Sequence, residues 1–169
     1  MTAIDVIRSA MQNCERATMQ LIDDMSDAPF TQPTARGGNQ PLWVLGHLTF
    51  IEGSVPHVLF GEPNPVAHWA PLFAPGTQPT TDAGVYPSLD ELRRTYRDLR
   101  ARNLQILEQL GEAGLDRPTK APPRGLEGIL RTAGDTFLVM ALHQMNHRGQ
   151  VADARRVAGR EPVFTPGVD

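Results

Sequence analysis

The sequence predicts an all-α protein folded as a four-helix bundle, and three observations support that prediction. Apolar residues recur at alternating spacings of three and four along several long segments, which is the period of an amphipathic helix. Stretches rich in proline and glycine separate these segments, and the apolar–polar alternation typical of β-strands is absent from the sequence. With 169 residues, of which 40% are hydrophobic, the chain has the size of a single domain, and we assign residues 1–169 to it.

Composition and charge limit the classes of partner. The formal net charge of -3 and the sequence pI of about 5.9 provide no basic surface, so we expect no nucleic-acid partner. The longest apolar run, residues 41–51, is interrupted by His47 and is too short to span a membrane. The single cysteine, Cys14, excludes an internal disulfide, and Asp5 and Arg8 interrupt the segment where a signal peptide would be apolar. We therefore expect a cytoplasmic protein with no membrane partner.

The first two helices are predicted over residues 4–25 and 41–60. Thr2 is a suitable N-terminal cap for the first helix, and Pro29 ends it. The second helix is apolar on most sides, so we expect other helices to surround it, and Pro56 is expected to kink its last turn or to end it early. The inward stripe of the first helix consists of Ile4, Ile7, Met11, Cys14, Thr18, Leu21 and Met25.

The second helix is followed by an unusually long connection. Residues 61–87 contain six prolines and at most one short helical turn, from His68 to Phe73. Such a segment is either a flexible insertion or a crossover that travels the length of the domain. We favour the crossover, which would let the second and third helices run parallel.

The third helix is predicted from the sequence SLDE at residues 88–91 to Leu110. Ser88 and Glu91 match a capping box, and Asn103 is the single polar member of the inward stripe. The same helix carries a row of arginines interleaved with acidic residues, which indicates a solvated face, with anion binding as the alternative. These arginines are Arg93, Arg97 and Arg100.

The fourth helix is predicted from a cap at Thr132, with Asp135 three residues further on, to a point before Gly159. The preceding residues 111–131 are rich in glycine and proline, with one helical turn expected near residues 126–130. Two histidines of this helix occupy inward positions at which a bundle normally places leucine. The inward stripe consists of Thr136, Met140, His143, His147, Val151 and Ala154.

The two inward histidines are candidates for metal binding. His143 and His147 are one helical turn apart on the same face, and a neutral imidazole in an apolar core needs a hydrogen-bond partner or a metal ion. His47, between Trp43 and Ile51 on the apolar second helix, is the candidate third ligand. Three imidazoles leave a divalent ion at least one open position, as in catalytic sites. The alternative is that two histidines four residues apart occur by chance in a chain with five histidines, and that they only pack in the core.

Two sequence motifs resemble those of a known family. The segment WVLGHLTFIEG in the second helix, and HQMNHRGQ followed by RRVAG in the fourth, are similar to the DinB-like (DinB/YfiT) superfamily of bacterial metal-binding four-helix bundles. This resemblance implies an up-down-down-up bundle and a three-histidine site for zinc or nickel, formed by His47, His143 and His147. Members of the superfamily include thiol-dependent S-transferases and a mycothiol-dependent isomerase, and they often form dimers, so a homodimer is a further expectation.

Four other residues are weaker candidates for the site. His57 is a reserve ligand, although we interpret it, like His68, as a surface or loop residue. Cys14 is expected to be a small core residue, with a role as a fourth, soft ligand as the alternative. Glu52 is a possible general base, but its offset from His47 turns it away from that face, which favours a surface or supporting position.

Four further residues have possible roles around the site. Gln150 and Asn146 are candidates for orienting a ligand or its water, or are simply polar surface residues. Trp43 and Trp69 are interpreted as packing aromatics rather than as a ligand cage.

The residues and the resemblance together favour a metal-dependent enzyme that activates a thiol or water. The most specific hypothesis is an S-transferase that uses a low-molecular-weight thiol. A metal-dependent hydrolase and a non-catalytic metal- or ligand-binding bundle remain the alternatives. We expect residues 61–87 and 111–131 to frame the mouth of the pocket, where a small-molecule substrate would be selected.

Overall fold

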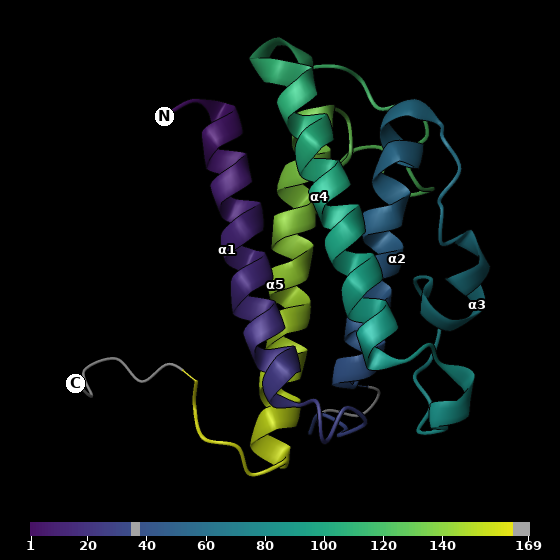
Figure 1. Cartoon of the computed structure of the whole chain (residues 1–169). Helices are drawn as coiled ribbons and strands as arrows, with labels where there is room; N and C mark the ends of the chain where they lie inside the picture. The colour runs from purple at the N-terminus through teal and green to yellow at the C-terminus, as the bar shows by residue number, and fades with distance from the viewer. Residues whose placement is uncertain (35–37, 164–169) are drawn as a thin grey trace.

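The structure is a computed structural model, and it describes residues 1–34 and 38–163. Four long helices lie side by side (Figure 1): α1 (Ala3–Asp24), α2 (Pro41–Phe60), α4 (Leu89–Gly114) and α5 (Ala133–Val157). The connection between α2 and α4 contains three short elements: η1 (Ala67–Trp69), α3 (Ala70–Phe73) and η2 (Ala83–Val85). The described residues form no strand, only an isolated bridge between Pro118 and Thr132. The all-α prediction is confirmed.

The helix ends follow the capping signals in the sequence. Thr2 and Asp5 exchange the two hydrogen bonds of a capping box at the start of α1, and the Thr132 hydroxyl accepts a bond from the Asp135 backbone N–H at the start of α5. Gly61 closes α2 in a left-handed conformation, with φ of 75°. The predicted boundaries of these helices are therefore confirmed to within one or two residues.

Helix α2 continues past Pro56 to Phe60, as the predicted range 41–60 requires, so of the two effects considered for this proline the early end is wrong. A proline cannot donate to the carbonyl four residues before it, which leaves the Glu52 carbonyl of α2 without its helical donor. The side-chain amide of Asn103 from α4 donates to that carbonyl at 2.9 Å. Asn103 is the one polar residue of the predicted inward stripe, and this bond explains its position.

The bundle core contains a buried ion pair that the sequence did not predict. Arg100 Nη2 lies 2.6 Å from Glu52 Oε1, and both side chains are buried, with 2% and 1% of their surfaces exposed. Asn103 donates to the same carboxylate, while Gln144 accepts from Arg100 and donates to the Tyr96 hydroxyl. The prediction of a solvated face is wrong for Arg100, and the surface position considered for Glu52 is also wrong.

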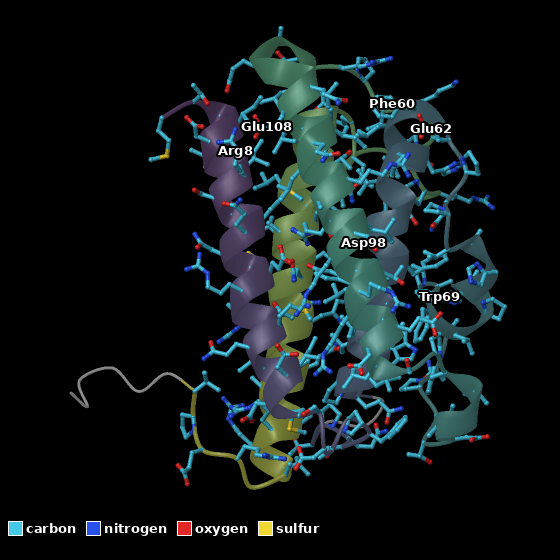
Figure 2. All side chains as sticks on the ribbon, viewed as in Figure 1. Arg8, Phe60, Glu62, Trp69, Asp98 and Glu108 are labelled. Atoms are coloured by element: carbon cyan, nitrogen blue, oxygen red, sulfur yellow. The ribbon has the colours of Figure 1, made fainter. Side chains whose placement is uncertain are left out.

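The outer faces carry the ordinary ion pairs of a helical surface. Arg8 of α1 pairs with Glu108 of α4, and Arg102 of α4 lies 2.8 Å from Glu62, which follows α2 (Figure 2). Arg97 is exposed, as the solvated-face prediction requires.

None of the described helices is both long and apolar enough to cross a membrane.

The long connection packs against one face of α2 at two glycines. A Cβ atom on Gly46 would lie 2.1 Å from the Phe73 ring, and one on Gly53 would lie 2.3 Å from the Asn64 side chain. Only glycine permits these approaches without a shift. The predicted helical turn between His68 and Phe73 is present as η1 and α3, and its last residue is held beside His47 of α2.

Candidate metal centre

The structure brings the three candidate ligands together from two helices. His47 lies on α2, and His143 and His147 lie one turn apart on α5. The Nε2 atom of His143 is 3.3 Å from that of His47 and 3.1 Å from that of His147. One nitrogen from each ring lies within 4.8 Å of the others, a grouping that could hold a metal ion.

The hydrogen bonds of the Nδ1 atoms determine the tautomers of two of the three imidazoles. His47 Nδ1 lies 2.7 Å from the backbone oxygen of Phe73, and His147 Nδ1 lies 3.0 Å from the side-chain oxygen of Gln150. These oxygens only accept hydrogen bonds, so each Nδ1 atom carries the proton and each Nε2 atom presents a lone pair. Two lone pairs therefore face the Nε2 atom of His143, which has at most one proton to share between them.

Burial keeps the rings neutral. It lowers the pKa of His47 to about 4, partly opposed by the hydrogen bond that His47 donates to the Phe73 carbonyl. It also lowers the pKa of His143 to about 3, with help from the two neighbouring imidazoles. The pKa of His147 is also lowered, mainly by burial. At neutral pH the three rings are therefore uncharged, and each can present a nitrogen lone pair to a cation once the His143 proton lies on Nδ1.

The nitrogen spacing fits a divalent ion. Metal–imidazole bonds of about 2.0 to 2.1 Å in a tetrahedral arrangement separate neighbouring nitrogens by roughly 3.3 Å. Two of the three separations in the structure, 3.3 and 3.1 Å, agree with that value, and all three ligand nitrogens lie within 4.8 Å of one another. The grouping contains no cysteine or carboxylate from the described residues, so the protein supplies three neutral ligands.

Trp43 forms one wall of the centre. Its ring stacks on His47 with the ring centroids 4.9 Å apart and the planes 8° from parallel. The indole N–H donates to the Leu72 backbone oxygen at 3.0 Å, one residue before the Phe73 carbonyl that holds His47. The same short connection thus fixes both the imidazole and the indole that packs on it.

A cavity of about 490 Å³ adjoins two of the three ligands, because His47 and His143 both line it. Its walls are apolar side chains of α2 and α5, such as Val55 and Met140. Loop residues complete it: Pro75 from the 61–87 connection, and Pro123, Leu126 and Leu130 from residues 111–131. The prediction that these two connections frame the pocket is confirmed.

A comparison with protein-family models gives the family. The model of the DinB superfamily matches residues 10–151, which is most of the chain. The chain belongs to the DinB superfamily. The match includes all three histidines, the whole of α2 and most of α5. None of the curated proteins compared with the chain matches it.

The other histidines and the cysteine of this DinB-superfamily chain lie outside the centre. His57 is exposed and contacts the Glu62 backbone oxygen at 3.0 Å, and His68 is exposed, so their interpretation as surface residues is confirmed. Cys14 is half-buried, and burial raises the pKa of its thiol. It does not belong to the ligand grouping.

Two expected supporting residues separate in the structure. Gln150 contacts His147 and also accepts from the Asn39 side chain at 3.1 Å, whereas Asn146 is exposed. The expectation of an orienting contact is confirmed for Gln150. The role of the Phe73 backbone oxygen was not predicted, because nothing in the sequence of a proline-rich connection indicates which carbonyl meets the ring.

Proposed function

We propose that this protein is a metal-dependent enzyme in which His47, His143 and His147 hold one divalent ion beside the cavity. The proposed reaction is the transfer of a low-molecular-weight thiol to a small electrophilic substrate. The single observation that supports it best is the convergence of three neutral imidazole nitrogens at the wall of a substrate-sized cavity. Zinc and nickel are the favoured ions, because imidazole ligands suit both.

Bound at these nitrogens, the ion would supply Lewis acidity that lowers the pKa of a thiol or water. The protein's own residues do the rest. Gln150 and the Phe73 carbonyl hold two rings in the required tautomer, Trp43 packs over His47, and the apolar walls exclude water from the electrophile. In the transfer, the thiol proton leaves to solvent, sulfur forms the bond to carbon, and the displaced group departs with its bonding electrons.

Metal-dependent hydrolysis is less well supported, because none of the described residues that line the cavity is acidic. Glu52 is a buried carboxylate five residues after His47, but it already forms an ion pair with Arg100 and accepts a hydrogen bond from Asn103. That same lack of a general base among the lining residues favours a non-catalytic ligand-binding bundle as the second candidate function.

Metal content of tag-free protein tests the proposal. We expect close to one divalent ion per chain in the wild type, a large loss in His143→Ala and in His147→Ala, and no loss in His57→Ala, whose ring is exposed and outside the grouping. Full metal content in both α5 variants would overturn the proposal. Metal retained with no turnover of any thiol–electrophile pair would favour the binding module.

The order in which the helices run is proposed to be up-down-down-up, with residues 61–87 as the crossover. Arg148 and Arg155 of α5 contact Ala17 and Asp24 of α1, which are offset by the same number of residues, as in parallel helices. The buried apolar residues form two groups. The first turns of α2 and of α4 contribute to one group, and the later turns of both helices contribute to the other, as expected for parallel helices.

We also propose a homodimer in the cytoplasm, with no nucleic acid among its partners. The single cysteine is usual for a cytoplasmic chain, and the net charge is -3. The outer face of α5 exposes Leu138, Leu142 and Met145 at helical spacing, an apolar stripe that a second copy could cover. A wild type that elutes as a dimer and a Leu142→Glu variant that elutes as a monomer would support this; a monomeric wild type would exclude it.

A further inference from the structure

The polar groups in the cavity wall are already engaged by the protein. The Ser54 hydroxyl donates to the Phe50 carbonyl and accepts from Asn64, both at 3.0 Å. The Thr136 hydroxyl donates to the Thr132 carbonyl at 3.0 Å. Apart from His47 and His143, the described lining residues are otherwise apolar and none is charged. Both hydroxyl protons are therefore in use, and the walls offer a ligand no free hydrogen-bond donor away from the histidines.

We propose that the cavity takes the electrophilic substrate, and that this substrate has one polar head directed at the histidines and an uncharged, apolar body. The inference rests on the proposed function, because the head meets the ion at its open position. A carbonyl or carboxylate in the body would lose its hydrogen bonds to water and find no free donor among the walls. The volume of about 490 Å³ is within the range of cavities that bury a small organic molecule.

A charged, multiply polar thiol is excluded from the same space by the same reasoning, because no cationic or free polar side chain among the lining residues could pair with its carboxylate or amide groups. Such a thiol must reach the ion from another side. The two reactants are thereby separated by their polarity.

Leu126 marks where the apolar substrate enters. This residue lines the cavity and is 40% exposed, so its side chain lies at the border between the cavity and solvent. The neighbouring Pro123 also lines the cavity and is exposed. Residues 123–130 therefore separate the apolar body from solvent.

The test is calorimetric titration with two homologous series: 1-alkanols on the metal-free protein and n-alkanethiols on the zinc-loaded protein. We expect affinity to rise about two- to fourfold for each added methylene until the chain fills the cavity, as burial of apolar surface requires. A series without chain-length dependence in either form would overturn the inference.

Val139 gives the decisive variant, because it lines the cavity and is half-buried. Val139→Glu should weaken the binding of octyl compounds by tenfold or more, while zinc stoichiometry stays unchanged. Val139→Phe should weaken the binding of the longest chains, because its ring occupies part of the cavity. Val6→Glu, at an exposed valine of α1, is the matched control and should bind as the wild type does. Equal octyl affinity in both Val139 variants and the control would overturn the inference.

The two proposals fail in different ways. A protein that binds zinc but shows no preference for longer chains contradicts the apolar substrate alone. If the protein binds alkanols in its cavity but takes up no zinc, the proposed metal-dependent enzyme is contradicted. The inference that the cavity takes a ligand with an apolar body is then still supported.

Discussion

Two of the three imidazoles of the centre are oriented by neighbouring groups. His47 is held by a backbone carbonyl and a stacked indole, and His147 is held by a side-chain amide. The Nδ1 atom of His143 is buried and has no hydrogen-bond partner. Two of the three candidate ligands are thus already oriented, which would reduce the free-energy cost of binding an ion.

Gln150 should contribute to metal affinity although it is not a ligand. Gln150→Ala removes the acceptor that holds the Nδ1 proton of His147, and we expect zinc affinity to fall by about 10- to 100-fold, as for other residues that support metal ligands. Competition with a chromophoric chelator measures the change. Asn146→Ala, at an exposed position one turn away, should leave affinity unchanged, and an equal loss in both variants would contradict the assigned contact.

The metal-free protein should lose stability on mild acidification. The pKa values of His47 and His143 are lowered on folding, so between the ordinary imidazole value near 6.5 and the folded values of about 4 and 3 the unfolded chain binds more protons. Stability is therefore complete above pH 6.5 and decreases as pH falls, by up to about 1.4 kcal/mol per pH unit for each such ring.

Urea unfolding in the presence of a chelator, between pH 7 and pH 5, measures this decrease. A variant with glutamine at His47, His143 and His147 should show a much shallower dependence on pH. If the variant and the wild type lose stability equally, the buried rings are not its source.

At the scale of the elements, the connection after α2 is part of the site. The Phe73 ring packs against Gly46 and its carbonyl holds His47. Gly46→Ala would place a Cβ atom 2.1 Å from that ring, so the ring and its carbonyl must move. We expect a loss of about 1–3 kcal/mol in the free energy of unfolding, as in other overpacked cores, together with weaker zinc binding.

Gly149→Ala provides the matched control, since a Cβ atom there meets nothing within 4 Å. Because alanine favours the helix more than glycine does, this variant should be neutral or more stable by up to about 1 kcal/mol. Thermal unfolding and zinc titration of the two variants would contradict the assigned packing if both behaved alike.

The long helices could be predicted from the sequence because their signals are local. The stripe spacing, the caps at Thr2 and Thr132 and the closing Gly61 depend only on neighbouring residues. Whether Pro56 would end α2 early could not be decided from the sequence, since the carbonyl that the proline frees is satisfied by Asn103 from another helix. Such a compensating bond has no signal near the proline itself.

At the scale of the whole molecule, the histidine triad could be predicted and the Glu52–Arg100 pair could not. The histidines stood out because imidazoles replaced leucines on apolar stripes. Arg100 lies in a sequence of alternating charges that is typical of an exposed face, and only the packing of α2, α4 and α5 shows that it is enclosed. The charges on a helix do not reveal which neighbour covers them.

Breaking that enclosed pair should affect the entire fold. Arg100→Met leaves the Glu52 carboxylate buried without its cation, and we expect a loss of about 3–5 kcal/mol in stability. Adding Glu52→Gln should recover part of the loss. The exposed pair of Arg102 and Glu62 is the control, because Arg102→Met should cost at most about 1 kcal/mol. Equal costs for the two arginines in denaturant unfolding would contradict the buried pairing.

X-ray absorption spectroscopy of the zinc-loaded protein tests the central claim most directly. We expect three imidazole nitrogens at about 2.0 to 2.1 Å and one further light ligand from solution, with one imidazole lost in each of His47→Ala, His143→Ala and His147→Ala. A spectrum that His47→Ala leaves unchanged, or one that shows a sulfur from Cys14, would contradict it.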